Sequence, residues 1–208
     1  MAYSSGHGAM RYAKFTIMKT HTRALIIISC GLMLSAYFFP LWQILLDAPQ
    51  YPEGLEMKIW LNGLSGNIPQ INGLNHYIGM KFISVDDFKE FKILPYVFSV
   101  LTLIGILSAA LKSRKLLLTW FIGLCLFAIV GFGDFYQWEY NYGHQLNPHA
   151  AIKVEGMYYQ PPLFGYKQLL NFTAGSLPDT GGLLVGLGGL LAAVALFYHP
   201  RSSSNQRS

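Results

Sequence analysis

The chain has 208 residues, of which 52% are hydrophobic and only 12% are charged. Soluble domains usually carry about 25% charged residues, so the composition indicates a membrane protein, and the length suits one compact domain. The net charge of +5 is not gathered in a basic patch interleaved with aromatic residues, which argues against a nucleic-acid partner. Cys30 and Cys125 lie inside apolar runs, where packing is a simpler role than relaying soft metal ions as a pair.

The first apolar run covers residues 24–46 and follows a basic tail at 1–23. The run contains no charged residue, and about 20 apolar residues are enough for a helix to cross the hydrocarbon core. A cleaved signal peptide would have a shorter apolar stretch of about 7 to 15 residues. We therefore expect a retained transmembrane helix that ends in an aromatic interfacial belt at 38–42.

A long polar loop follows at 47–94. Residues 57–61 alternate between apolar and other side chains, which predicts a short strand. The segment 71–80 is too polar to cross a membrane and is expected to be a short helix or a loop. Ser84 and the acidic residues after it resemble a helix start, which predicts a short amphipathic helix before the next apolar run.

The remaining apolar runs lie at 95–111, 116–132 and 181–198. The first two flank the basic turn 112–115 and are expected to form a helical hairpin. The third of these runs is rich in glycine, and the spacing of Gly182 and Gly186 is typical of close contact between membrane helices. A second long loop, 137–180, lies between the runs 116–132 and 181–198 and is rich in tyrosine, proline and asparagine.

These runs predict an all-α integral membrane protein with four transmembrane helices and two long loops packed together on one side. The domain would cover 24–198, with basic tails at 1–23 and 199–208. The two tails and the turn 112–115 hold nine of the fifteen Lys and Arg residues and no acidic residue. Because basic residues mark the cytoplasmic side, we expect both termini on the cytoplasmic side of a cytoplasmic membrane. Both loops are expected on its outer side, in a periplasm if the host has one.

Five outer-loop residues carry nitrogen or sulfur donors for a metal: His76 and Met80 in the first loop, and His144, His149 and Met157 in the second. His76 and Met80 are four residues apart, which places both on one face of a helix. Imidazole with thioether suits copper, particularly Cu(I), better than zinc or magnesium. The spacing is not specific, and a lone His with a Met at helical spacing more often serves packing or a satisfied polar contact.

At Gln50–Leu55, Ile71–Met80 and Gln168–Phe172 the chain resembles a group of small uncharacterised bacterial four-helix membrane proteins. That group is associated with the assembly of copper enzymes, in particular nitrous oxide reductase maturation. The resemblance covers about residues 24–198 and implies copper delivery or cofactor insertion outside the cytoplasmic membrane. It implies no ligand set, so the five donors above rest on their chemistry alone.

The expected function is therefore a membrane-anchored copper-handling or metalloenzyme-assembly factor rather than an enzyme. Its expected partners are the lipid bilayer and a membrane or periplasmic protein. The alternative is a non-catalytic membrane subunit of a respiratory or redox complex, which would hold haem or quinol or dock a partner. Asp134, next to Glu139 at the outer end of the third run, is a further ionisable group near membrane depth, for which a structural role at the interface is expected.

Overall fold

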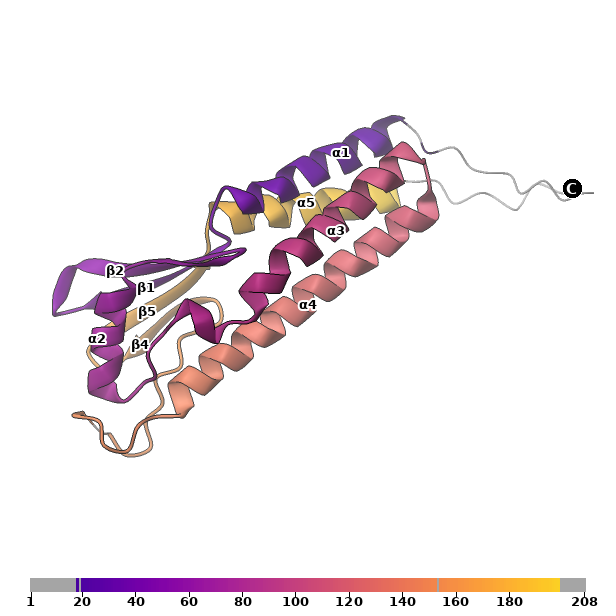
Figure 1. Ribbon diagram of the computed structural model, residues 1–208. Helices are drawn as coiled ribbons and strands as arrows, with labels where there is room; N and C mark the ends of the chain where they lie inside the picture. The colour runs from indigo at the N-terminus through magenta and orange to yellow at the C-terminus, as the bar shows by residue number, and fades with distance from the viewer. Residues whose placement is uncertain (1–17, 19, 153, 199–208) are drawn as a thin grey trace, which may run out of the picture.

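The computed structural model describes residue 18 and residues 20–152 and 154–198. A bundle of helices forms one end of the molecule, and a β-sheet covered by one helix forms the other (Figure 1). One long helix, α4, runs along the bundle and continues beside the sheet. The predicted basic tails at 1–23 and 199–208 lie mostly outside the described residues.

The bundle consists of α1 (Thr20–Leu34), α3 (Glu90–Ala110), α4 (Arg114–His144) and α5 (Thr180–Phe197). Its interior is built from buried apolar side chains, among them Ile26, Phe98 and Trp120. The helix α1 lies against α5, and Ser29 Oγ donates a 2.6 Å hydrogen bond to the carbonyl oxygen of Gly188. Most of the bundle's outward side chains are apolar and exposed, as expected of helices whose solvent is lipid.

The sheet is antiparallel with the strand order β3-β2-β1-β5-β4. Its strands are β1 (Trp42–Ala48), β2 (Tyr51–Trp60), β3 (Gly63–Gly66), β4 (Gly165–Leu169) and β5 (Phe172–Pro178). The strand β1 is central and pairs with β5, with Leu45 opposite Gly175. The strand β1 separates the strands of the first long loop, β2 and β3, from those of the second, β4 and β5. The two loops meet elsewhere, where the N–H groups of Asn147 and Ile152 donate to the carbonyl oxygens of Gly79 and Tyr77, so the expected contact between them is confirmed.

The prediction of an all-α protein with four transmembrane helices is wrong. In the part of the chain that the structure describes, three helices are long and apolar enough to cross a membrane: α3, α4 and α5. The run 24–46 is not one helix, because α1 ends at Leu34, a short 3-10 helix follows at Ser35–Tyr37, and β1 begins at Trp42. At 1.5 Å per residue the 15 residues of α1 span about 22 Å, less than the hydrocarbon core of about 30 Å.

The physical reason lies in the second half of that run. Pro40 has no N–H for a helix to continue through, and β1 has a hydrogen-bonded strand on each side. Only the face with Ile44, Leu46 and Ala48 is buried, but Leu45 on the other face is apolar as well. The run Ile44–Leu46 is therefore continuously apolar, and over so few residues hydrophobicity does not distinguish a strand from a helix.

Several local predictions can be compared directly with the structure. The strand predicted at 57–61 is confirmed as part of β2, and the polar segment forms the short helix α2 (Ile68–Ile78). Ser84 does cap a helix, since its Oγ accepts from the N–H of Asp86, but the helix is only a 3-10 turn at Val85–Asp87 before α3 begins. The predicted third run is longer than expected, because α4 continues twelve residues past 132.

The glycines of α5 pack differently from the expected pair. A Cβ on Gly182 would lie 2.1 Å from the carbonyl oxygen of Leu41, whereas a Cβ on Gly186 would meet nothing within 4 Å. The close approach at Gly182 therefore joins the start of α5 to the chain just before β1. The glycine at the contact between two helices is Gly188, where a Cβ would lie 3.1 Å from the carbonyl oxygen of Ser29 in α1.

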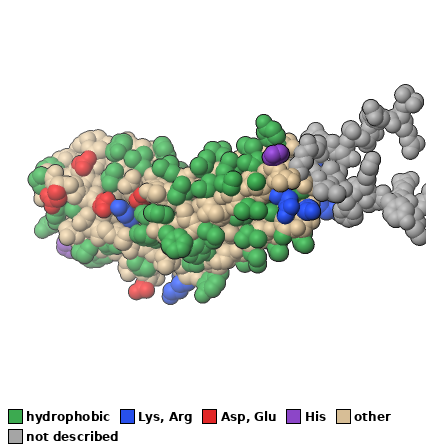
Figure 2. Space-filling view, turned by 90° about the horizontal axis from the view of Figure 1, so that it is seen from above, with side chains coloured by type: hydrophobic (Ala, Val, Ile, Leu, Met, Phe, Trp, Pro, Cys, Tyr) green, Lys and Arg blue, Asp and Glu red, His purple; other side chains and the backbone are tan. Residues whose placement is uncertain are grey.

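Charge is distributed along the long axis of the molecule. Figure 2 shows a group of Lys and Arg side chains at the bundle end, whereas acidic side chains appear only toward the sheet end, where basic ones lie as well, and much of the surface between the two ends is apolar. Where the bundle meets the sheet, the ring of Trp42 packs edge-on against Phe132, Phe135 and Phe164, with centroid distances of 5.6, 5.9 and 6.1 Å. Aromatic side chains favour the membrane–water interface, and the predicted interfacial belt at 38–42 stays a prediction, since Trp42 belongs to β1 rather than to the end of a membrane helix.

Candidate functional site

A cavity of about 590 Å³ lies between the sheet, α2, the last turns of α4 and the loop 145–164. The sheet provides its floor because side chains alternate between the two faces of a strand. Ile44, Leu46 and Ala48 of β1 point to the cavity, and cross-strand pairing places Met57 opposite Ile44 and Ala174 opposite Leu46. The floor is therefore apolar.

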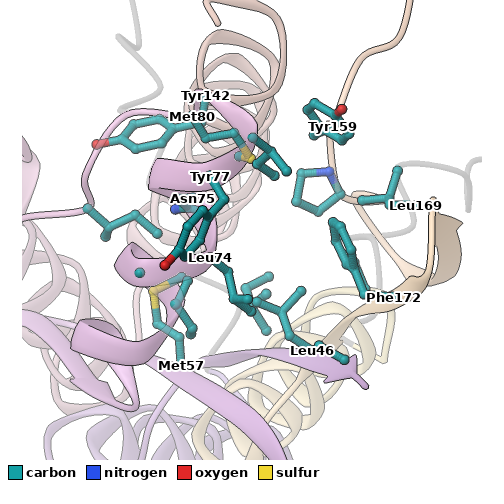
Figure 3. Close-up of a pocket in the computed structure, with 18 of the residues that line it drawn as sticks. Leu46, Met57, Leu74, Asn75, Tyr77, Met80, Tyr142, Tyr159, Leu169 and Phe172 are labelled. Carbon is teal, nitrogen blue, oxygen red and sulfur yellow. The ribbon is translucent and has the colours of Figure 1, made fainter. Parts of the chain in front are cut away.

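The helix α2 covers the floor. Ile71, Leu74, Asn75 and Ile78 follow the spacing of one helix face, and all four line the cavity. In Figure 3 the side chains of Leu74 and Met80 face those of Leu169 and Phe172 across the space.

The end of α2 is fixed by Gly79, which has a left-handed conformation with φ of 80°. A Cβ on this glycine would lie 2.9 Å from the carbonyl oxygen of Asn147. Both the left-handed conformation and this close contact therefore require glycine at the position. The N–H of Asn147 donates a 2.7 Å hydrogen bond to the carbonyl oxygen of Gly79, which joins the loop 145–164 to α2.

The helix α4 supplies the polar part of the wall. Glu139 lines the cavity and is fully buried, with an exposed fraction of 0%. Neither carboxyl oxygen has a hydrogen-bond partner among the described residues. About 20 residues counted from Leu116 suffice to cross the hydrocarbon core, so the crossing part of α4 ends near Phe135 and Glu139 lies beyond it. Burial raises the pKa of this carboxyl from 4.5 to about 8.

The loop 145–164 closes the cavity at Gly143, one helical turn after Glu139. The N–H of Tyr159 donates a 3.0 Å hydrogen bond to the carbonyl oxygen of Gly143, and a Cβ on Gly143 would lie 2.4 Å from Cα of Gln160. The loop backbone thus rests directly on the helix. This contact brings the ring of Tyr159 into the wall, where its hydroxyl is buried and has no partner in the described structure.

The two donors predicted in the first loop do not form a pair. Because α2 ends at Ile78, Met80 lies beyond the helix, and the expected shared face of His76 and Met80 does not exist. His76 is exposed and stacks on Phe82, with ring centroids 5.9 Å apart, whereas Met80 lines the cavity.

The three donors of the second loop are also separate. His144 ends α4 and is stacked between Tyr140 and Tyr158, at centroid distances of 3.9 and 4.3 Å. His149 is exposed, and Met157 lines a second, smaller cavity below the loop. Among the described residues no group of three or more His, Cys, Asp or Glu side chains is placed to hold a metal. The prediction of a copper cofactor is therefore wrong.

The site residue that sequence reasoning missed is Glu139. From the sequence it is only a neighbour of Asp134 at the end of a predicted span. The available signal was the spacing of Phe135, Trp138, Glu139 and Tyr142, which puts one acid among three aromatic residues on a single helix face. That pattern predicts a buried carboxyl once the helix is known to continue to His144.

Comparison with known proteins adds no family to this description. No family model matches the chain, and a search of curated proteins found no match. The resemblance to proteins associated with nitrous oxide reductase maturation therefore stays a prediction.

Proposed function

We propose that this protein is a membrane-anchored binding protein whose sheet domain holds one small, largely apolar molecule. The observation that carries the proposal is the cavity of about 590 Å³ with apolar walls and a single buried carboxyl, that of Glu139. Ligand pockets are typically apolar cavities of about 300–1,000 Å³ with a few polar groups that orient the ligand.

The position of the cavity also supports this function. Its wall includes the continuation of α4, a helix long and apolar enough to cross a membrane. The aromatic cluster around Trp42 lies where that helix leaves the bundle. A cavity on the same helix suits a ligand with low solubility in water.

We further propose that the sheet domain faces the outside of a cytoplasmic membrane. The basic turn at 112–115 lies between α3 and α4 at the bundle end, and acidic side chains gather toward the sheet end (Figure 2). Basic residues favour the cytoplasmic side.

Of the functions expected from the sequence, a membrane subunit of a redox complex with a quinol pocket is compatible with such a cavity. The copper-handling function has no cluster of donors to support it in the described residues. A partner protein remains a proposal that follows from the redox-complex alternative.

The test is the thermal stability of the protein in phosphatidylcholine nanodiscs with and without decane and decan-2-one. A ligand at 100 times its Kd stabilises the folded state by about 2.7 kcal/mol, which raises the unfolding temperature. Leu74→Trp places an indole from α2 into the cavity and should abolish the increase. Leu45→Trp is the matched control, because Leu45 is half-buried on the opposite face of the sheet and should leave the increase unchanged. An equal response of the parent and Leu74→Trp would refute the proposal.

A further inference from the structure

Two cavities adjoin each other where α2 ends. The second cavity has a volume of about 320 Å³, roughly half that of the first, and is lined mainly by the loop 145–164. Ile78, Ile152 and Tyr159 line both cavities. These three residues therefore form the partition between the two spaces.

The partition is built from two different parts of the chain. On one side is Ile78, the last residue of α2, which is buried with an exposed fraction of 8%. On the other side is the loop, which is joined to α2 by a 2.8 Å hydrogen bond from the N–H of Ile152 to the carbonyl oxygen of Tyr77. Since Gly79 follows Ile78 and has no side chain, Ile78 is the last side chain that α2 places at the partition.

The first cavity extends along both the strand and the helix that enclose it. Ile44, Leu46 and Ala48 follow one another along its floor and, at about 3.4 Å per residue, cover about 14 Å of β1. Ile71 and Ile78 lie on the opposite side, about 10 Å apart along α2 at 1.5 Å per residue. The cover that α2 provides thus ends at Ile78, where the second cavity begins.

We infer, on the basis of the proposed binding function, that the ligand is a molecule with an unbranched chain that lies along β1, between the sheet and α2. Ile78, together with Ile152, forms the wall that sets the longest chain the cavity accepts. Apart from Glu139, the described residues that line the cavity carry no charge, which suits methylene groups along the length of the chain.

The experiment measures which chain lengths the protein retains. Protein in detergent is equilibrated with an equimolar series of alkan-2-ones, from octan-2-one to octadecan-2-one, and the bound ketones are identified by native mass spectrometry. Each methylene that fits strengthens binding from water about fourfold, and the gain ends at the length that fills the cavity. The parent should therefore retain ketones up to an upper length. Because every variant meets the same micellar mixture, partition of the probes into detergent cancels when variants are compared.

Ile78→Ala should open the partition and raise the upper length by about half of the parent's carbon number, because the second cavity is about half as large as the first. Ile71→Ala is the matched control. Ile71 is 2% exposed, belongs to the same helix and lines only the first cavity, so its replacement should raise the upper length by no more than the roughly three carbons it removes. Ile152→Ala opens the partition from the loop and should act like Ile78→Ala. Because Ile152 is 48% exposed, its replacement keeps the test available if Ile78→Ala does not fold.

The outcomes separate the inference from the proposed function. If the parent retains none of the ketones, the binding function itself fails. If ketones bind but Ile78→Ala and Ile152→Ala raise the upper length no further than Ile71→Ala does, the partition does not limit the chain and the inference is overturned. Adamantan-2-one has as many carbons as decan-2-one in a compact shape. If it displaces decan-2-one from the parent at equal concentration, the cavity selects a compact molecule and the unbranched chain is wrong.

Discussion

Replacing Glu139 by glutamine removes the ionisable group from the cavity wall and keeps nearly the same side-chain volume. The pKa of Glu139 is raised by burial from 4.5 to about 8 in the folded protein. The folded state therefore holds the proton more tightly than the unfolded state. The stabilising contribution of this proton is fully present below pH 4.5 and is lost as the pH rises through about 8.

The size of the effect follows from the two pKa values. At about 1.36 kcal/mol for each pKa unit, the change from 4.5 to about 8 corresponds to roughly 5 kcal/mol of unfolding free energy. Solvent in the adjoining cavity of about 590 Å³ screens the charged form, so roughly 5 kcal/mol is an upper value. Glu139→Gln should remove this pH dependence of the unfolding free energy. The stability of the variant relative to the parent should therefore rise steadily between pH 5 and pH 8.

The assay is denaturant unfolding of the detergent-solubilised protein, followed by tryptophan fluorescence at each pH from 5 to 9. Glu53→Gln is the matched control, because Glu53 is exposed on β2 and its replacement should leave the parent's pH profile unchanged. Parallel profiles for the parent and Glu139→Gln would show that the carboxyl is already ionised or hydrated in the folded state, and the reasoning about the cavity would be refuted.

Two further predictions follow from the packing and the charge pattern. Gly143→Ala should lower the unfolding free energy by about 1–3 kcal/mol, because the new Cβ meets the backbone of Gln160. Gly133→Ala in the same helix meets nothing within 4 Å and should be neutral or stabilising by up to about 1 kcal/mol. Thermal unfolding of both variants checks this prediction, and equal losses of stability would contradict it. A topology reporter inserted after Ser113 should be cytoplasmic and one near Asn147 external, and an external signal after Ser113 would refute the proposed orientation.

The helices at 95–111, 116–132 and 181–198 were predictable because long apolar runs have few alternatives to membrane helices. The run 24–46 failed as a single helix because hydrophobicity alone does not distinguish a helix from a central strand. Pro40 lies near the change, but a proline is also common at the end of a membrane helix. One partner strand of β1, β2, is nearby in the sequence, whereas residues of the other, β5, are 126 to 136 residues away (Asp47↔Thr173 to Trp42↔Pro178), so their pairing is a tertiary property.

The candidate site was predictable only in part. The Asn72–Met80 segment does contribute to the cavity, through Leu74, Asn75 and Met80, but not through the predicted His76 and Met80 pair. That pair assumed a helix through Met80, and the left-handed Gly79 ends the helix first. Glu139 was missed because the predicted helix ended too early. Its burial depends on α4 continuing to His144 and on the loop at Tyr159 closing over the helix.

Native mass spectrometry of the protein purified from its own membranes tests the binding function most directly. Release from the detergent micelle in the gas phase leaves tightly held molecules in place, and their mass can be measured after dissociation. We predict that the parent and Leu45→Trp retain one small apolar molecule per chain and that Leu74→Trp retains none. A parent that carries no such molecule, or a Leu74→Trp variant that carries the same one, would contradict a ligand-binding cavity between the sheet, α2 and α4.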